Sequence, residues 1–267
     1  MLIQFPPTKV RIKIGTDKEN CKKPHSFIAF YGKIEEKYRF LAKKQCISIK
    51  CLVISEESTT FAAKMTNRME KMNIAIFVSG SGTNCENLIK YFADHASIKP
   101  ALVVSNKQDA YALVRAERLG VPTAVTPKAD LNDPDVMLPL LEKYDIGFIV
   151  LAGFLPLVPN FLIDAYPHKI INIHPALLPK YGGKGMWGHH VHEAVKAAGE
   201  TETGMTVHWV TPVCDAGEII AQFRVALSPD DSVDDIAEKE HQLEMQYFPA
   251  VVEQVLKQTI SLQEAGK

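Results

Sequence analysis

From Met72 onward, hydrophobic runs of strand length alternate with segments whose apolar residues recur at helical spacing. The strand-length runs are Asn73–Val78, Ala101–Ser105, Thr123–Val125, Ile146–Ala152 and Ile170–Ile173. The helical patterns between them cover Glu86–Ala93, Ala110–Leu119, Pro134–Tyr144 and Pro159–Ala165. Strands that alternate with helices predict a parallel sheet with helices on both faces.

The pattern changes after residue 200. Two runs, Thr203–Val210 and Glu218–Val225, are expected to form successive strands, and a long helix is expected from Ser232 to Leu256. Ser232 is a good N-cap residue, and the acidic residues around it favour the helix dipole. We therefore expect an α/β fold with an open, mostly parallel twisted sheet, helices on both faces and antiparallel additions near the C-terminus.

One uncharged stretch, Ile146–Ile163, reaches the minimum length of a membrane span. Glycines and prolines interrupt it, including Gly153 and Pro159. These residues instead predict a buried strand, a loop and a short helix, so no membrane association is expected.

The overall composition is that of a globular protein. The 267 residues are 46% hydrophobic and 23% charged, and the formal net charge is 30 − 31 = −1. A dedicated nucleic-acid binder would carry a strong basic excess, so no nucleic-acid partner is expected. Five cysteines at irregular spacing do not form a disulfide framework, which favours a reduced, cytoplasmic enzyme.

The average conceals a break in the chain near Met72. Residues 1–71 hold 15 Lys and Arg against 7 Asp and Glu, a net charge of +8, whereas residues 72–267 hold 15 against 24, a net of −9. No sustained helical or strand period occurs in 1–71. We expect this basic extension to be disordered or to result from an over-extended gene model, because Met65, Met69 and Met72 are alternative starts.

The segment Ser79–Asn84 is a glycine-rich turn between a predicted strand and a predicted helix. Free backbone N–H groups and the helix dipole suit a phosphate at such a junction. No Gly-Lys-Ser/Thr follows, and Cys85 stands where a dinucleotide fingerprint has its third glycine, so a monophosphate is expected. The alternative is a turn whose glycines serve the backbone alone.

Three polar residues suggest catalysis. Asn172 and His174 lie on one face of a strand that Pro175 ends, at the edge where α/β sheets bind ligands. Asp215 lies in the turn before the last strand, where a carboxylate near the imidazole would raise the histidine pKa and orient the ring. Each residue also has a structural interpretation, as a core histidine or a turn residue. Together they outline a site that stabilises an oxyanion and moves protons.

A run of glycines and histidines covers residues 182–192. His189, His190 and His192 suggest a metal, but no Cys or acidic partner has ligand spacing, so no metal is expected. The glycines instead predict a mobile loop beside the site.

Several segments in the right order resemble the glycinamide ribonucleotide formyltransferases, the folate-dependent enzymes of purine synthesis. They are Met72–Asn84 (MNIAIFVSGSGTN), Val104–Lys107 (VSNK), Val150–Phe154 (VLAGF), Ile171–Tyr181 (INIHPALLPKY), Gly204–Thr211 (GMTVHWVT) and Asp215–Gly217. The resemblance covers residues 72–267 and implies a Rossmann-like formyltransferase domain there. Nothing in residues 1–71 matches.

The resemblance implies a role for each site residue. Asn172, His174 and Asp215 would be the catalytic trio, with His208 close by. The ribonucleotide would be bound by Ser81, Gly82, Thr83, Asn84 and Glu244. The folate pocket would be lined by Leu155, Pro156, Leu157, Val210 and Thr211. The family often has Arg where this chain has Pro156, and the 182–192 loop is longer and richer in glycine than the common pattern.

The implied reaction transfers the formyl group of 10-formyltetrahydrofolate to the amine of glycinamide ribonucleotide. Asn172 and a protonated His174 would stabilise the tetrahedral oxyanion, and no metal is required. The expected partners are these small molecules, with the chain a monomer or homodimer.

Three alternatives remain at this point. A formyltetrahydrofolate hydrolase usually has a second His after the catalytic one, whereas Pro175 follows His174 here. A methionyl-tRNA formyltransferase has a basic C-terminal domain. A non-catalytic phosphate or nucleotide sensor would use the 79–84 loop alone.

Overall fold

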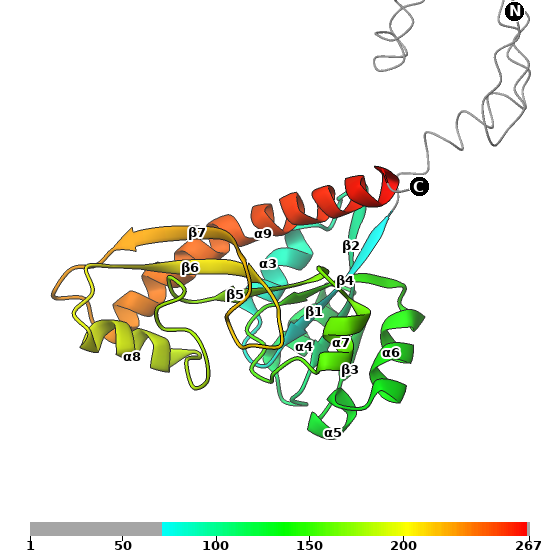
Figure 1. Cartoon of the computed structure of the whole chain (residues 1–267), viewed down its shortest axis with the longest axis horizontal. Helices are drawn as coiled ribbons and strands as arrows, with labels where there is room; N and C mark the ends of the chain where they lie inside the picture. Colours follow the sequence, from blue (N-terminus) through cyan, green and yellow to red (C-terminus); the bar gives the residue numbers. More distant parts are fainter. Residues whose placement is uncertain (1–70, 266–267) are drawn as a thin grey trace, which may run out of the picture. The chain divides into compact units, whose positions relative to one another are not determined.

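The computed structural model describes residues 71–265, which form a seven-stranded sheet with helices packed against it (Figure 1). The strands are β1 (Met72–Val78), β2 (Ile98–Ser105), β3 (Thr123–Val125), β4 (Ile146–Leu151), β5 (Ile170–His174), β6 (Glu202–Trp209) and β7 (Ile219–Ala226). The helices are α3 (Thr83–Tyr91), α4 (Tyr111–Arg118), α5 (Lys128–Leu131), α6 (Pro134–Lys143), α7 (Asn160–Ala165), α8 (His189–Ala197) and α9 (Val233–Ala265).

The strand order is β3-β2-β1-β4-β5-β6-β7. Strands β1 to β5 pair in parallel, and β6 and β7 are antiparallel additions at one edge. This confirms the predicted fold class. The change of direction falls between β5 and β6, so the residues at the end of β5 lie at the junction of the two kinds of pairing.

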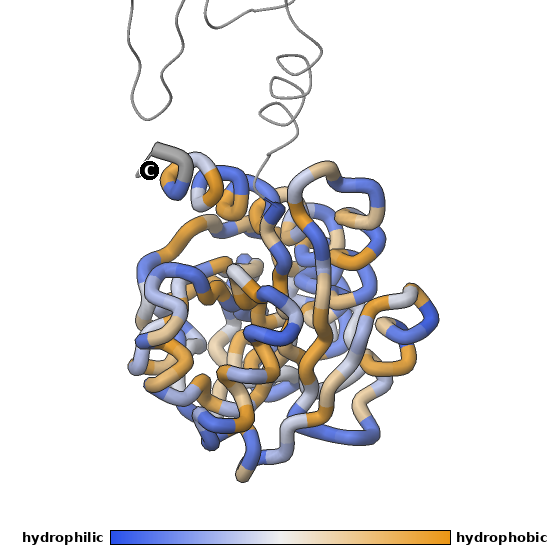
Figure 2. The backbone as a smooth tube through the Cα atoms, turned by 90° about the vertical axis from the view of Figure 1, so that its right-hand side faces the viewer, coloured by the Kyte–Doolittle hydropathy of each residue, from blue (hydrophilic) through white to orange (hydrophobic). Residues whose placement is uncertain are grey.

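Two hydrophobic clusters fill the two faces of the sheet. Helices α3, α4 and α9 bury apolar residues with one face, and α5, α6 and α7 do so with the other. Figure 2 shows the hydrophobic strand segments inside the polar outer turns of the helices. Because both faces are covered, the parallel strands are near-continuous apolar runs rather than alternating ones.

The histidine-rich part of the predicted loop is helical, which corrects the sequence expectation. Helix α8 begins at His189, so His189, His190 and His192 lie in its first turn and only residues 182–188 form a loop. Val191 and Val195, four residues apart, are buried and give the helix an apolar face. The glycines before His189 favour a loop, so this short helical pattern was not predicted.

Helix α9 begins at Val233 and continues to Ala265, beyond the predicted end. Ser232 caps it as expected, since the backbone N–H of Asp235 donates to the Ser232 hydroxyl oxygen at 3.1 Å. The Asp235 carboxylate in turn accepts from the backbone N–H of Ser232 at 2.8 Å. This reciprocal capping fixes the start of the helix that carries Glu244.

The uncharged stretch Ile146–Ile163 forms β4, a loop and the first residues of α7, as predicted. Among the helices of residues 71–265, none combines the length and the apolar character that crossing a bilayer demands. The expectation for the basic segment 1–71 lies outside the described residues, apart from Lys71.

Candidate active site

Asn172 and His208 face each other across the junction of β5 and β6. The two residues are direct partners in the antiparallel register, and the Asn172 Nδ2 donates to His208 Nε2 at 3.1 Å. The other ring nitrogen of His208, Nδ1, donates to the Trp209 carbonyl oxygen at 2.9 Å. One N–H of the Asn172 amide is therefore committed to His208, and the second is left for another acceptor.

His174 is the last residue of β5 and is 4% exposed. Its Nε2 donates to the Tyr181 carbonyl oxygen at 2.8 Å, and its Nδ1 lies 3.7 Å from Asp215 Oδ2. Burial lowers the pKa of His174 below its usual value, and the Asp215 charge and the Tyr181 carbonyl offset this only in part. Asp215 therefore does not raise the pKa of His174 above its usual value in the free protein, because desolvation outweighs the carboxylate. The protonated imidazole of the implied mechanism stays a prediction.

Asp215 is tied to the same centre by three groups. The backbone N–H of Gly183 donates to Oδ2 at 2.9 Å, the Cys214 thiol donates to the same oxygen, and Oδ1 lies 3.6 Å from His208 Nε2. Burial alone would raise the pKa of Asp215, but His208, the Gly183 amide and the nearby His174 lower it to about 2. The carboxylate is therefore ionised at neutral pH.

The turn after Pro175 positions the carbonyl that His174 contacts. The Thr206 hydroxyl donates to the Ala176 carbonyl oxygen at 2.6 Å and accepts from the backbone N–H of Leu178 at 3.1 Å. The Gln222 side chain donates to the Leu178 carbonyl at 2.8 Å. Strands β6 and β7 thus hold the turn that leads to Tyr181.

A cavity of about 230 Å³ beside this turn is lined by residues that include Lys180 and Arg224, and it does not include the catalytic candidates.

The glycine-rich segment connects β1 to α3. Gly82 is the N-cap of α3 with φ 75°, and a β-carbon there would lie 2.3 Å from the Ala112 β-carbon. Only glycine therefore allows α4 to approach the start of α3. Ser81 is exposed at this turn, and its carbonyl oxygen accepts from Arg115 Nε at 2.9 Å. The segment has the strand-turn-helix form expected for an anion site.

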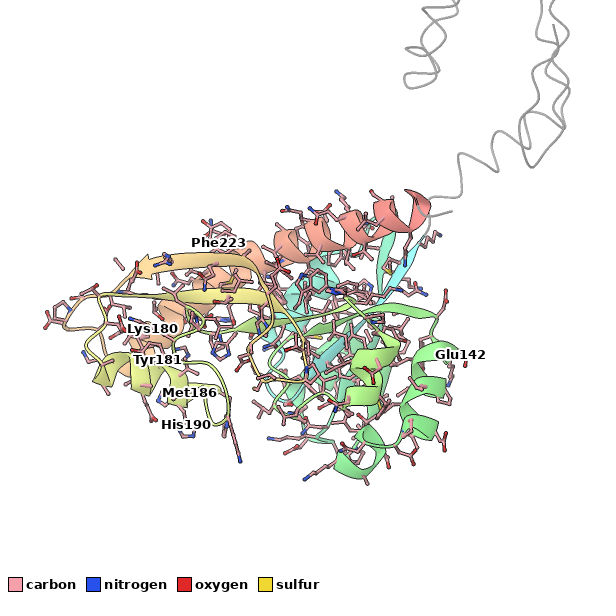
Figure 3. All side chains as sticks on the ribbon, in the orientation of Figure 1. Glu142, Lys180, Tyr181, Met186, His190 and Phe223 are labelled. Carbon is pink, nitrogen blue, oxygen red and sulfur yellow. The ribbon has the colours of Figure 1, made fainter. Side chains whose placement is uncertain are left out.

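Glu244 reaches the same end of α3 from α9. Its Oε2 accepts from Asn84 Nδ2 at 2.7 Å and lies 3.3 Å from His241 Nδ1. The Tyr247 ring, one turn further along α9, stacks on Phe223 of β7 with 4.2 Å between the ring centroids. Figure 3 shows Phe223 on β7 beside α9. This stacking anchors the helix, so the contact between Asn84 and Glu244, far apart in sequence, is well supported.

The residues expected to line a folate pocket lie on two loops. Leu155 and Leu157, after β4, are exposed, and Val210 and Thr211, after β6, are half-buried, as is Pro156. Phe154 and Val210 pack against the same hydrophobic cluster, which brings the two loops to one region. Exposed leucines on neighbouring loops offer an apolar surface of the kind that an aromatic ring system covers.

The structure thus joins the predicted residues into two groups. Asn172, His174 and Asp215 meet at the end of β5, and Asn84 meets Glu244 between α3 and α9. The contacts of the Tyr181 carbonyl and the Gly183 N–H were not predicted, because every residue has these backbone groups and the sequence does not show which of them a site uses. The resemblance placed His208 close to the trio, whereas the residue pattern alone would have needed the register of β5 against β6 to find it.

No group of three or more His, Cys, Asp and Glu side chains within residues 71–265 has an arrangement that could hold a metal ion. Near the expected loop, the His190 Nδ1 instead lies 3.2 Å from the Glu193 carboxylate. Figure 3 shows Lys180, Tyr181, Met186 and His190 along the segment that leads into α8.

Residues 72–252 match the family model described as formyl transferase. The chain belongs to the formyl transferase family. It is 36% identical to the chloroplastic phosphoribosylglycinamide formyltransferase of Arabidopsis thaliana over 197 residues, which cover 70% of this chain and 68% of that protein. It is 35% identical to the phosphoribosylglycinamide formyltransferase of Haemophilus influenzae, over 67% of this chain and 84% of that protein.

Solved structures of formyl transferases have the same fold. Glycinamide ribonucleotide transformylase 1 from Geobacillus kaustophilus matches with a TM-score of 0.64 and 33% identity, over 70% of this chain and all of that chain. The resemblance stated from the motifs is thereby confirmed, as is the Rossmann-like sheet with antiparallel strands at its edge.

Proposed function

We propose that this formyl transferase transfers the formyl group of 10-formyltetrahydrofolate to the amine of glycinamide ribonucleotide. The observation that carries the proposal is the convergence of Asn172, His174 and Asp215 at the end of β5. An amide, an imidazole and a carboxylate at one place suit transfer of an acyl-type group through a tetrahedral intermediate. The names of the two similar proteins support the same substrate.

The reaction begins when the amine nitrogen attacks the formyl carbon. The new C–N bond converts the formyl oxygen to an oxyanion, and the second N–H of the Asn172 amide donates to that oxygen. The bond to folate N10 then breaks, and the proton lost by the amine ends on N10. Positioning two bound substrates supplies about 7–11 kcal/mol of the barrier reduction.

His174 accepts the amine proton in this mechanism, because burial lowers the pKa of its imidazole and so favours the neutral form. Nε2 carries the hydrogen bond to the Tyr181 carbonyl, so in the neutral ring Nδ1 is the basic nitrogen. A proton on Nδ1 faces the ionised Asp215 carboxylate 3.7 Å away. The carboxylate stabilises the imidazolium as it forms, and the imidazolium in turn stabilises the oxyanion.

The two substrates occupy opposite sides of this centre. The ribonucleotide phosphate binds at Ser81–Asn84, and Glu244 accepts hydrogen bonds from the ribose hydroxyls. The folate lies against the loops that contain Leu155–Leu157 and Val210–Thr211. The chemistry needs no metal. We further propose that the protein acts in the cytoplasm, as a monomer or homodimer, without a nucleic-acid or membrane partner.

The test is an assay of the purified protein with glycinamide ribonucleotide and 10-formyltetrahydrofolate. We expect equal amounts of formylated ribonucleotide and tetrahydrofolate, and no comparable release of formate when the amine is omitted. Release of formate at the same rate without the amine would establish the hydrolase alternative. Binding of the ribonucleotide without turnover would establish the sensor alternative.

A further inference from the structure

Two buried carboxyl groups lie on one face of α9. Glu240 precedes Glu244 by four residues, one helical turn, and the two residues are 3% and 8% exposed. Neither carboxyl forms an ion pair with Lys or Arg among the residues that the structure describes. Glutamate is rarely buried to this extent without a cationic partner, and of the two only Glu244 has an imidazole beside it, that of His241 at 3.3 Å.

Three buried side-chain nitrogen or oxygen atoms without a hydrogen-bond partner belong to residues around Glu244. They are Asn84 Oδ1 from α3, His192 Nδ1 from α8 and Glu240 Oε1 from α9, and residues 71–265 contain only two others, on Thr126 and Thr203. An unpaired buried polar atom destabilises the folded protein, so such atoms rarely gather without a ligand. A set of acceptors with one imidazole suits vicinal hydroxyl groups, which both donate and accept.

Two adjacent buried carboxyls cannot both carry a charge at moderate cost, because each disfavours ionisation of the other. Burial, the charge of Glu244 and a hydrogen bond with its carboxylate raise the pKa of Glu240 well above the usual value. A proton on Glu240 would make this carboxyl the hydrogen-bond donor of the pair and Glu244 the acceptor.

We propose that Glu240 is a positioning residue of the ribose subsite, a neutral donor that orients the Glu244 carboxylate toward the hydroxyl groups of the substrate. The inference rests on the proposed function, in which Glu244 binds those hydroxyls. Asn84 holds one oxygen of Glu244 from α3, and Glu240 holds the carboxylate from within α9. Ionisation of Glu240 would add a second negative charge and remove the donor.

Four imidazoles also affect this pair. His241 of α9 contacts Glu244, and the hydrogen bond to Glu244 raises the pKa of His241. Burial lowers the pKa of His192 of α8 and of His174 of β5, and the negative charge of Glu244 raises both in part. The charge of His189 also lowers the pKa of His192. A change of affinity with pH can therefore come from His241 as well as from Glu240, and the variants must separate the two.

Two variants test the role of Glu240: Glu240→Gln keeps a neutral donor that does not titrate, and Glu240→Leu removes the donor. The control is Glu142→Gln, which removes one exposed carboxyl from α6, away from α9 in Figure 3. We would measure KM for the ribonucleotide and kcat of each protein from about pH 6 to about pH 9.5. In the wild-type protein and in Glu142→Gln, KM should rise with pH.

Glu240→Gln should keep the neutral-pH KM within about two-fold of the wild-type value and lose the alkaline rise in KM. Glu240→Leu should raise KM about ten-fold across the range, since a hydrogen bond to a charged group is lost. Both variants should keep kcat within about two-fold, because the reacting groups are untouched. The inference is overturned if Glu240→Gln retains the alkaline rise, if Gln and Leu give equal KM values, or if kcat changes instead.

Thermal unfolding gives a second test that needs no substrate. The raised pKa of Glu240 means that the folded protein binds more protons than the unfolded chain, so this residue's contribution to stability falls as pH rises through the folded pKa. The Tm of Glu240→Leu should therefore rise relative to wild type with increasing pH, and a constant Tm difference would contradict the inference. A wild-type protein that does not formylate the ribonucleotide but shows this Tm trend would refute the proposed function and leave the proton on Glu240 established.

Discussion

The two halves of the candidate site differ in how completely their polar groups are paired. At the end of β5, the side chains of Asn172, His174 and Asp215 all contact protein groups, including backbone groups at Tyr181 and Gly183. Between α3 and α9, Asn84 and Glu240 each present a buried oxygen without a partner. Under the proposed function, the first half is preorganised for proton transfer, whereas the second is completed by a bound ligand.

The largest expected effect is on the preorganised half. His174→Ala and Asp215→Ala should each lower kcat by about 10²–10³-fold, since each removes a group that acts on the transition state. Affinity for the ribonucleotide, measured by calorimetry, should remain close to that of the wild-type protein. A variant with wild-type kcat, or one that loses affinity and keeps kcat, would show that catalysis and ribonucleotide binding are not divided between the two halves in this way.

A change at Gly82 should act on the other half. Gly82→Ala must place a β-carbon at positive φ and 2.3 Å from the Ala112 β-carbon, so it should cost about 2–4 kcal/mol of stability. The distorted start of α3 should also raise KM for the ribonucleotide more than it lowers kcat. Denaturant unfolding and steady-state kinetics measure the two effects.

Gly80→Ala is the matched control, because a β-carbon at Gly80 meets no atom within 4 Å. It should leave the free energy of unfolding nearly unchanged. Equal losses of stability in the Gly80 and Gly82 variants would mean that close packing of α4 against α3 does not define this turn.

A smaller effect is expected at the start of α9, outside both halves. Ser232→Ala removes the N-cap hydroxyl that Asp235 uses and should destabilise the protein by about 1 kcal/mol. Ser261→Ala, at an exposed serine of the same helix, should cost much less. Normal KM in Ser232→Ala would show that stability of α9 and substrate affinity are separable, and a raised KM would show that the cap also positions Glu244.

The last prediction concerns protonation in the free protein and needs no loss of function. In an NMR titration, the imidazoles of His174 and His192 should have midpoints below 6.5, because burial lowers both pKa values. His241 should titrate above 6.5, because Glu244 accepts its hydrogen bond. Single His→Gln variants assign the signals. A midpoint of His174 above 6.5 would contradict the predicted effect of burial, and a midpoint above the assay pH would make the imidazolium the resting form.

The sequence predicted the parts of the site that depend on local pattern. The apolar run before Asn172, and Pro175 after His174, placed both residues at the end of a buried strand. The glycine at 82 marked the turn before α3. These features depend on neighbours in the chain, so one segment contains the information.

Other features depend on distant segments and could not be predicted in this way. The bond between Asn172 and His208 depends on the register of β5 against β6. The lowered pKa of His174 depends on how deeply the folded chain buries the ring, whereas the charge of Asp215 alone suggested a raised pKa. The first turn of α8 was missed because the preceding glycines favoured a loop over a short amphipathic pattern.

The connection between β6 and β7 has a consequence for how this protein can change. Residues 210–215 contain both the proposed folate contacts at Val210 and Thr211 and the carboxylate of Asp215. The connection closes at Gly217, where a β-carbon would lie 1.7 Å from the Trp209 carbonyl oxygen. An insertion in this short bridge would shift the wall of the donor pocket and the proton-handling group together. Under the proposed function, recognition of the one-carbon donor and the rate of its chemistry are therefore linked through this segment, and a change in one would alter the other.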